Sequence, residues 1–446
     1  MKKQTQAIHT SFQSHDAYGS LAMPVYHTAA YEFNNATEMA DAFCGRSDAP
    51  DYSRVTNPTV TYLENKIREL KGATGVVAMS SGMAAISNTL FCLSATGKNI
   101  VSSRHLFGNT YALIGGTMLR FGVKPKLVDL TNLEEVEAAV DNNTACIFME
   151  IITNPQMEVA DIAALADIAH SKNIPLVADT TMIPFTHFDA HALGVDIEVV
   201  SSTKYISGGA TSIGGLVIDY GMPNFTKRMR QEMLMNFGAY MTPHVAYMQN
   251  LGLETLDARY RVQAQNALTV ARALKEVKEI KRVNYIGLED NPYYELSRRQ
   301  FGETSGAMLT IDLESQEACF DCINRLQLVR RATNLFDNKS LAIHPASTIF
   351  GNFTPRQREK MDVLDTTIRL SIGLEAAEDI IEDIKGSLTP DSLTPGPSPI
   401  ERGEDVLVGS FFSVFVIFVL FVIVFVIVVL FIYLNLSFAC AQPSRL

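Results

Sequence analysis

The 446-residue chain has little of several features that mark particular classes of protein. Its six cysteines are too few and too scattered for a disulfide-stapled fold of this length. Lys and Arg number 37 against 48 Asp and Glu, so a net charge of -11 excludes the basic surface that nucleic-acid binding requires. The charged residues 2–3 are followed by Gln4, Gln6 and His9, where an export signal would be apolar, so we expect a cytoplasmic protein.

Charged residues are also scarce, at 19% of the chain, whereas hydrophobic residues make up 47%. This balance excludes intrinsic disorder and leaves enough apolar surface for a large core. At roughly 150 residues per domain, the length predicts two or three domains.

The C-terminal sixty residues differ from the rest. Residues 387–399 repeat Ser-Leu-Thr-Pro and continue with Gly-Pro-Ser-Pro, which predicts an extended Pro-rich linker at 387–410. The 23 residues from Phe411 to Tyr433 carry no charge and exceed the roughly 20 that cross a bilayer as a helix. We favour a hydrophobic tail at 411–446 that is a non-native appendage. A membrane anchor is the second interpretation, and a buried core element is the third.

Short apolar runs alternate with amphipathic stretches between about residues 70 and 220. The apolar runs predict buried strands at Gly75–Met79, Asn99–Ser102, Lys126–Leu130, Cys146–Ile151, Leu176–Asp179, Ile197–Ser201 and Gly215–Asp219. Helical spacing lies between several of them, as in Leu133–Val140 and Ile162–Ser171. The alternation predicts an α/β fold with a mostly parallel sheet that is covered on both faces. Ligands bind such sheets at the carboxyl ends of the strands, so residues just after them are the candidate site.

A long helical pattern, from Leu253 to about Val277, separates this block from a second one at roughly 285–386. The second block mixes strand and helix patterns and predicts a smaller α+β domain. We therefore expect an N-terminal arm at 1–55, a major domain at 56–250 and a C-terminal domain at 251–386.

Two predicted strands end in groups that suit cofactor chemistry. The strand Ile197–Ser201 leads through hydroxyl residues to Lys204, and a lysine behind hydroxyls that can hold a phosphate suits a Schiff-base role. The strand Leu176–Asp179 ends in an acid that could pair with the pyridinium nitrogen of pyridoxal phosphate. Either residue alone is more simply a helix cap or a surface lysine, but together they favour a cofactor site.

Residues 80–85 supply a third element of this site. They follow the predicted strand Gly75–Met79 and open a helix, so backbone N–H groups at its positive end could hold an anion. Gly82 would permit close approach, although a glycine could equally serve only a tight turn.

Five segments occur in the order found in the Cys/Met-metabolism family of pyridoxal-phosphate enzymes, and the chain resembles that family from residue 1 to about 386. The segments are residues 52–59, 81–85, 179–181, 201–205 and 369–375. The resemblance implies the type I, aspartate-aminotransferase-like fold. Within the family, residues 105–111, 207–211 and 330–347 most resemble O-acetylhomoserine sulfhydrylases.

The resemblance implies a role for each matching residue around the cofactor. Lys204 would form the Schiff base and move protons between substrate carbons, Asp179 would hold the pyridinium nitrogen, and Phe107 would stack on the ring. The residues implied to hold the phosphate from the same chain are Gly82, Met83, Ser201 and Thr203. The residues implied to complete the cofactor site are Ser81, Asn154 and Thr181.

The resemblance also implies a shared site and a substrate subsite. Tyr52 and Arg54 would reach the phosphate of the neighbouring subunit, so the protein would be a homo-oligomer, with a dimer of dimers expected. Arg369, with Ser340 nearby, would bind the carboxylate of an amino-acid substrate, for which a planar bidentate donor is suited.

Two positions depart from patterns within the family. Many members have a tyrosine where this chain has Phe107, and methionine γ-lyases favour a cysteine where it has Asn109. Phe107 can stack but cannot exchange a proton. Because a carboxylic acid has a pKa of about 4 and a thiol about 8.5, an acyl group needs less protonation to leave, which favours an acylated substrate.

We therefore expect γ-replacement on O-acetyl-L-homoserine with sulfide or a small thiol, giving homocysteine or methionine in transsulfuration and methionine biosynthesis. The first alternative is a cystathionine or methionine γ-lyase, which would not require sulfide. The second is a membrane-tethered binding protein with an idle fold, which depends on the C-terminal tail being genuine. We expect no metal site, because Cys319 and Cys322 lie in a helical pattern with no second cysteine pair.

Overall fold

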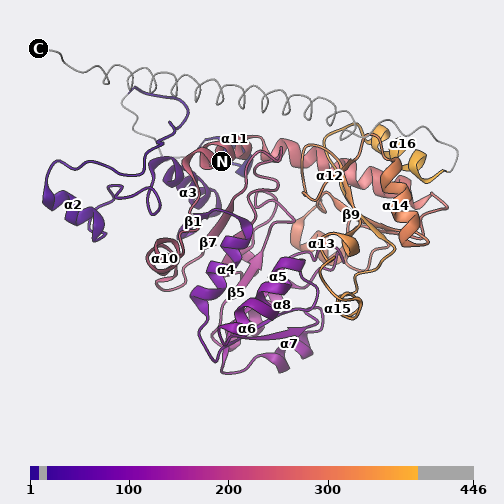
Figure 1. The fold of residues 1–446 in the computed structure, drawn as a ribbon, viewed down its shortest axis with the longest axis horizontal. Coiled ribbons are helices and arrows are strands. Elements are labelled where there is room, and N and C mark those ends of the chain that lie inside the picture. The colour runs from indigo at the N-terminus through magenta and orange to yellow at the C-terminus, as the bar shows by residue number, and fades with distance from the viewer. Residues whose placement is uncertain (10–17, 390–446) are drawn as a thin grey trace, which may run out of the picture. The chain divides into compact units, whose positions relative to one another are not determined.

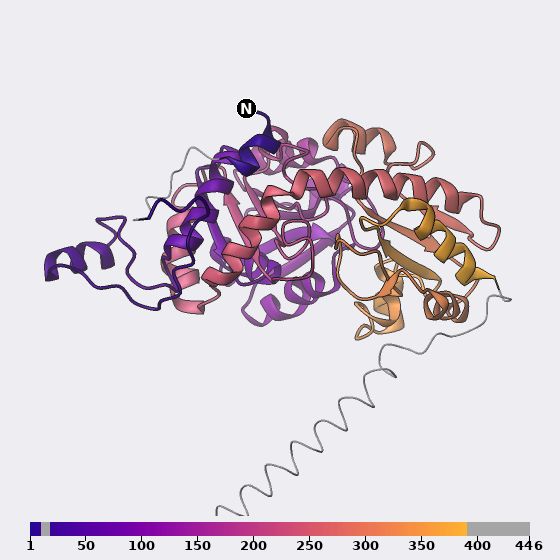
Figure 2. The same ribbon diagram turned by 90° about the horizontal axis from the view of Figure 1, so that it is seen from above.

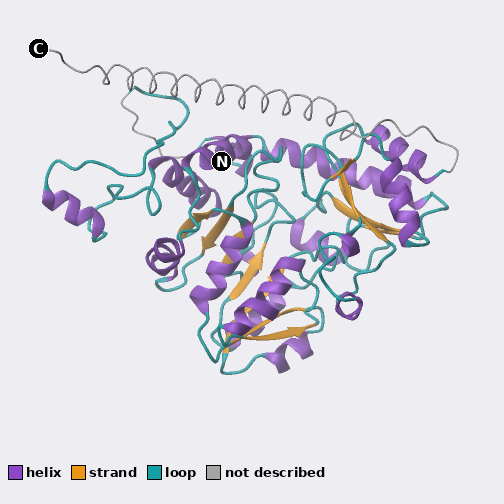
Figure 3. Cartoon of the chain, in the orientation of Figure 1, coloured by secondary structure: helices purple, strands orange, loops and turns teal. Residues whose placement is uncertain are grey.

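The larger of two β-sheets corresponds to the alternating block of the sequence (Figure 3). The computed structural model describes residues 1–9 and 18–389. Within these residues the larger sheet has seven strands, which are β1 (Gly75–Met79), β2 (Asn99–Ser103), β3 (Lys124–Val128), β4 (Thr144–Glu150), β5 (Leu176–Asp179), β6 (Ile197–Val200) and β7 (Gly215–Asp219). The prediction is matched at both ends for β1, β5 and β7 and within two residues for the other four.

The strand directions bring one set of ends to a common edge. The spatial order is β1-β7-β6-β5-β4-β2-β3, and β7 pairs antiparallel with both of its neighbours, β1 and β6. The pairs β6/β5, β5/β4, β4/β2 and β2/β3 are all parallel. All strands except β7 therefore point the same way, which confirms the mostly parallel sheet and places their carboxyl ends along one edge.

Both faces of this sheet are buried, as the continuous apolar runs predicted. Along β4, Cys146 and Phe148 pack into one apolar cluster, whereas Ile147 and Met149 pack into the other. All four side chains have no solvent exposure. Each strand of such a parallel sheet has an unbroken apolar sequence, because alternate side chains enter separate cores.

Capping residues set the ends of the helices that cover the sheet. Asn57 caps the N-terminus of the third helix with Pro58 in its first turn, and Gly72 ends it in the left-handed conformation. The helices are α1 (Lys3–Ile8), α2 (Ala36–Phe43), α3 (Pro58–Lys71), α4 (Gly82–Leu93), α5 (Gly108–Ala112), α6 (Met118–Arg120), α7 (Leu133–Ala139), α8 (Ile162–Ser171), α9 (Phe225–Arg228), α10 (Met235–Phe237), α11 (Pro243–Glu254), α12 (Leu256–Lys275), α13 (Tyr294–Phe301), α14 (Gln316–Arg325), α15 (Pro355–Lys360) and α16 (Ala377–Leu388).

The smaller sheet forms the second block with its own helices. Its strands are β8 (Arg282–Asn284), β9 (Met308–Asp312), β10 (Arg330–Arg331), β11 (Leu341–Ile343) and β12 (Thr367–Ser371), in the order β10-β11-β12-β9-β8. Apart from the parallel pair β10/β11, the strands run antiparallel. Helix α12 contacts both α11 and the strands β8 and β9, so it links the two blocks (Figures 1 and 2). This agrees with the predicted smaller α+β region.

The sequence predicts an arm at residues 1–55 and a Pro-rich linker from residue 387. Helix α2 projects away from the rest of the described chain in two perpendicular views (Figures 1 and 2). At the other end, α16 continues to Leu388, two residues into the predicted linker. The remainder of that linker and the tail at 411–446 lie outside the described residues. Within the described part, no helix is long and apolar enough to cross a membrane.

His105 joins the two blocks near the common edge. It follows β2, is 3% exposed, and holds two carboxylates: Glu158 at 2.5 Å from Nδ1 and Asp362 at 2.8 Å from Nε2. Burial alone would lower the pKa of His105, but the hydrogen bonds and charges of Glu158 and Asp362 outweigh burial and raise that pKa. The doubly protonated ring can donate to both carboxylates at once.

We predict that His105 stabilises the fold more at low pH than at high pH. Because its pKa in the folded protein is above the unfolded value of about 6.5, its contribution is complete below that value and is lost as the pH rises through the folded pKa. Urea denaturation of wild type and His105→Asn should give a larger difference in unfolding free energy near pH 6 than near pH 9. The exposed His244→Asn is the control, and an equal difference at both pH values for His105→Asn would contradict the prediction.

Candidate active site

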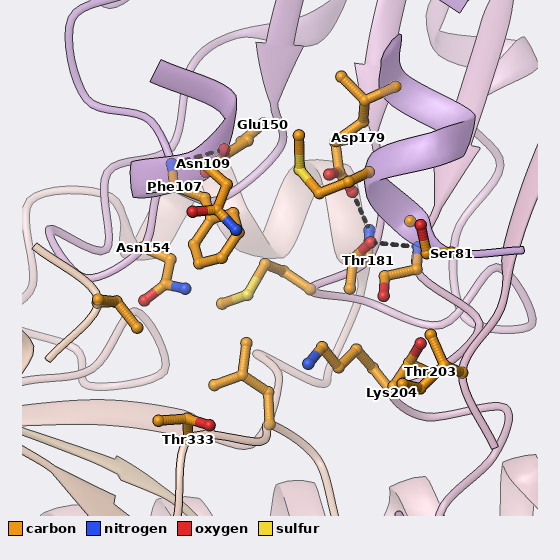
Figure 4. Close-up of a pocket in the computed structure, with 18 of the residues that line it drawn as sticks. Ser81, Phe107, Asn109, Glu150, Asn154, Asp179, Thr181, Thr203, Lys204 and Thr333 are labelled. Carbon is orange, nitrogen blue, oxygen red and sulfur yellow. Dashed lines mark hydrogen bonds between the residues drawn. The ribbon is translucent and has the colours of Figure 1, made fainter. Parts of the chain in front are cut away.

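The carboxyl edge of the larger sheet opens into a cavity of about 660 Å³ (Figure 4). Strands from both sheets contribute to its wall, because β12 supplies Arg369 from the smaller sheet. All but three of the site residues predicted from sequence line this cavity. The predicted residues that line it are Ser81, Gly82, Met83, Phe107, Asn154, Asp179, Thr181, Ser201, Thr203, Lys204 and Arg369.

Lys204 extends its amine into the cavity from the turn after β6 (Figure 4). Its Nζ donates to the side-chain oxygen of Asn334 at 3.0 Å. Burial, and then the positive charge of Arg369, lower the pKa of Lys204 to about 8, against the opposing charges of Asp179 and Asp337. An appreciable fraction of the amine is therefore neutral near physiological pH and able to act as a nucleophile or base.

Asp179 ends β5 and faces the same cavity. Its Oδ1 accepts the backbone N–H of Thr181 at 3.0 Å, and the Thr181 hydroxyl accepts the backbone N–H of Ser201 at 2.8 Å (Figure 4). Thr181 thus ties the end of β5 to the end of β6. Burial raises the pKa of Asp179, while hydrogen bonds from Thr181 and the charge of Lys204 partly offset that rise.

The N-terminus of α4 forms another wall. The Ser81 hydroxyl accepts the N–H of Ala84 at 3.0 Å, which leaves the first N–H groups of the helix, on Gly82 and Met83, for another partner. A Cβ on Gly82 would lie 2.7 Å from the Cβ of Ser201, so only glycine fits against the end of β6. Helix N-termini with free N–H groups and a positive dipole end bind anions.

Arg369 is the second positive group in the cavity wall. Its Nη1 donates to Asn154 Oδ1 at 3.2 Å and its Nη2 donates to the carbonyl of Thr333 at 3.2 Å. Its Nε is buried and has no hydrogen-bond partner among the described residues. Burial lowers the pKa of Arg369 to about 9. A buried guanidinium with an unused donor suits a planar anion such as a carboxylate.

Phe107 and apolar residues form the remaining wall. The Phe107 ring lies across the cavity from Lys204, beside Asn109 (Figure 4). The apolar residues that line the cavity are Met83, Ile86, Met182, Ile213, Leu335 and Ile349. The site therefore combines charged groups at its base with a surface that can cover a flat ring.

Three predicted site residues do not line the cavity. Tyr52 is 43% exposed, with the Arg54 guanidinium 5.6 Å from its ring centroid, and Arg54 also donates to the carbonyl of Met235. Ser340 is fully buried; its hydroxyl donates to Glu375 at 2.9 Å and accepts the N–H of Gly373 at 2.9 Å. Ser340 is thus committed to the turn before β11, and the predicted roles of Tyr52 and Arg54 toward a neighbouring subunit stay predictions.

Sequence reasoning missed several polar residues of the site, among them Glu150 and Asn334. Glu150, the last residue of β4, lines the cavity, and Asn334 holds the Lys204 amine. Glu150 ends a buried strand as Asp179 does, but Ile151 and Ile152 continue the apolar run after it, so the sequence signal at Glu150 is weaker. Asn334 carries no such signal, because its contact with Lys204 depends on how the smaller sheet packs against the larger one.

Comparisons with known proteins agree over most of the chain. The profile of the Cys/Met metabolism PLP-dependent enzyme family matches residues 4–389. An L-methionine gamma-lyase of Fusobacterium nucleatum is 37% identical over 86% of this chain and 97% of its own length. An O-acetyl-L-homoserine sulfhydrylase of Corynebacterium glutamicum is 32% identical over 86% and 96%. A Campylobacter jejuni crystal structure, described as an O-acetylhomoserine (thiol)-lyase carrying a pyridoxyl-lysine phosphate, has a TM-score of 0.84 at 32% identity and covers 87% of this chain and 100% of its own.

We predict that the Lys204 amine reacts with trinitrobenzenesulfonate, an amine reagent, with a pH midpoint of about 8. Brief labelling of the ligand-free protein at graded pH, followed by peptide mapping, measures that midpoint. In Arg369→Met the midpoint should rise, because the positive charge that disfavours protonated Lys204 is removed. A midpoint near 10.4, the usual value for lysine, in both proteins would contradict the prediction.

Proposed function

Because the chain belongs to the Cys/Met metabolism family of pyridoxal-phosphate-dependent enzymes, we propose that it catalyses γ-replacement on O-acetyl-L-homoserine. Sulfide or a small thiol would replace the acetyl group, giving homocysteine or methionine. The chain is a pyridoxal-phosphate-dependent enzyme of Cys/Met metabolism.

The residues present fit pyridoxal phosphate. Gly82 lies where a Cβ would collide with Ser201, which gives an anion close access to the N-terminus of α4. The Lys204 amine and the Asp179 carboxyl both face the cavity next to that helix end. When bound, the cofactor supplies an electron sink for negative charge that develops at substrate carbons.

The remaining chemistry is assigned to the protein's own side chains. Lys204, with its pKa lowered to about 8, would take a proton from the substrate and return it at a neighbouring carbon. Asp179 would hold the pyridinium nitrogen, and Phe107 would cover the ring. Arg369 would bind the substrate carboxylate with its unpaired Nε, while Asn154 holds its Nη1.

The proposed preference for an acylated substrate depends on the identity of residue 107. Phe107 lines the cavity and cannot donate a proton to a leaving group. A thiolate leaving group, with a pKa of about 8.5, needs such a proton far more than a carboxylate, with a pKa of about 4. Within the cavity, Phe107 therefore favours loss of acetate over loss of a thiolate.

The loop from Thr333 to Asp337 belongs to a region whose sequence resembles O-acetylhomoserine sulfhydrylases. Its contacts in the site support the proposed reaction. Asn334 accepts a hydrogen bond from Lys204 at 3.0 Å and donates to Asp337 at 3.1 Å. The carbonyl of Asn334 also accepts from Arg369 at 3.3 Å. This one residue therefore contacts both positive groups of the site.

A methionine γ-lyase is the second candidate, because a relative of that name from Fusobacterium nucleatum is 37% identical to this chain. Such an enzyme would expel a thiolate and release a keto acid without added sulfide. Asn109 lines the cavity at the position where methionine γ-lyases favour a cysteine, which weighs against this candidate.

We also propose that a second copy completes the site. Tyr52 is exposed and Arg54 is half-buried, and both follow α2 in the chain, whose side chains Met39 and Phe43 are 49% and 55% exposed. An apolar helix surface that projects from the molecule suits burial against a partner subunit. The partner's Tyr52 and Arg54 could then reach the phosphate, and a dimer of dimers would repeat the arrangement.

Product analysis tests the proposed reaction. The purified full-length chain is supplied with O-acetylhomoserine, O-succinylhomoserine, cystathionine or methionine, each with and without sulfide. We expect homocysteine from O-acetylhomoserine only when sulfide is present, with kcat/KM about tenfold or more above that for cystathionine or methionine. A higher kcat/KM for cystathionine or methionine, with keto acid released in the absence of sulfide, would instead establish the γ-lyase.

Replacing Phe107 tests the argument from the leaving group. In Phe107→Tyr the phenol can donate a proton, so kcat/KM for cystathionine should rise relative to that for O-acetylhomoserine. Phe107→Leu is the control, because loss of the aromatic ring should lower turnover of both substrates alike. An unchanged ratio in Phe107→Tyr would show that residue 107 does not set the substrate preference.

A further inference from the structure

Glu150 is a buried acid that the mechanism above does not use. It ends β4 and pairs in register with Asp179 on β5, so the two side chains emerge as neighbours on adjacent strands. Glu150 is 7% exposed, and both side chains line the cavity. Two carboxylates this close repel each other when both are ionised.

The contacts of the two acids differ. Asp179 is hydrogen-bonded by Thr181 and lies within the field of the Lys204 amine, and both effects favour its charged form. Among the described residues, Glu150 is contacted only by backbone N–H groups. Burial, and then the charge of Asp179, raise the pKa of Glu150 well above its usual value. Hydrogen bonding by the backbone of Phe107 and Asn154 opposes this rise without cancelling it.

The two backbone groups that Glu150 holds belong to residues of the site. Its Oε1 accepts the N–H of Phe107 at 2.8 Å (Figure 4), and the backbone N–H of Asn154 lies close enough to its carboxyl group to favour the charged form. Phe107 begins α5 with no side-chain cap of its own, and Asn154 holds Arg369 at 3.2 Å through its side chain. One side chain thereby holds the backbone at Phe107 and lies beside the backbone of Asn154, which belongs to another wall of the cavity.

We propose that Glu150 is a positioning residue that fixes Phe107 and Asn154, and through Asn154 the guanidinium of Arg369, by acting as a buried hydrogen-bond acceptor. The inference rests on the proposed roles of Phe107, Asn154 and Arg369. It does not depend on which substrate the enzyme uses. Misplacement of a group by about 1 Å in an active site can cost 100-fold in rate, so a residue that only aligns others can matter for turnover.

Three substitutions distinguish a role of Glu150 as a hydrogen-bond acceptor from a role that requires its ionisable proton. Glu150→Gln keeps a carbonyl oxygen for both N–H donors and cannot ionise. Glu150→Ala removes the acceptor and leaves the backbone N–H of Phe107 without this partner. Glu150→Met also removes the acceptor but keeps the volume of the side chain, so it replaces the alanine variant if that variant fails to fold. Glu137→Ala, on the exposed side of α7, is the matched control.

The variants are compared as holoenzymes by visible circular dichroism of bound pyridoxal phosphate, by its dissociation constant from equilibrium dialysis, and by kcat and KM per bound cofactor. We expect Glu150→Gln to stay within about threefold of wild type in kcat, with an unchanged dichroism spectrum. We expect Glu150→Ala and Glu150→Met to lose about 10- to 100-fold in kcat, to raise KM for the amino acid, and to weaken the dichroism band.

Two results would overturn the proposal. In the first, Glu150→Ala or Glu150→Met keeps the wild-type dichroism, cofactor affinity and kcat while only its melting temperature falls, which would mean a purely structural role. In the second, Glu150→Gln is as impaired as Glu150→Ala, which would mean that the ionisable proton matters. If wild type itself turns over none of the substrates tested, the proposed reaction fails, but dichroism and cofactor affinity still decide the role of Glu150.

Discussion

The shared carboxyl edge of the parallel strands is the constraint on which the site depends. Because β7 runs antiparallel to both neighbours, β1 returns to the direction of β6, β5 and β4. The ends of four strands therefore deliver an anion-binding helix start, a lysine and two acids to one place, as expected for open α/β sheets. The smaller sheet then covers this edge and adds Arg369 from β12.

The electrostatics of the cavity follow from that placement. Lys204 and Arg369 share a poorly solvated space, so burial lowers the pKa of each, to about 8 and about 9. The acids Asp179 and Glu150 share the opposite wall, where burial raises both pKa values. Pairs of like groups in one low-dielectric pocket shift toward their neutral forms, which is the condition that proton transfer near neutral pH requires.

Much of this could be predicted from the sequence because the relevant signals are local. Strands that are buried on both faces have unbroken apolar sequences. In a parallel sheet, the residue at the carboxyl end of such a strand lies at the ligand-binding edge. This is why Lys204, Asp179 and Gly82 were found together. Glu150 lacks this signal, because Ile151 and Ile152 continue the apolar run beyond it.

The rest depends on long-range packing that no local pattern encodes. Asn334 lies 130 positions from Lys204 and meets it only because the two blocks pack together. Ser340 has the hydroxyl that a substrate subsite could use, but the fold commits it to Glu375 and Gly373. Tyr52 and Arg54 lie outside the cavity of one chain, so the role proposed for them depends on contact with a second copy.

The most direct test of the account is to locate the covalent attachment of the cofactor. Borohydride reduction of the yellow holoenzyme, followed by proteolysis and mass spectrometry, should place the mass of a pyridoxyl phosphate on Lys204, and Lys204→Ala should give no labelled peptide. A label on a different lysine of the wild-type chain, or an unchanged label in Lys204→Ala, would contradict the account.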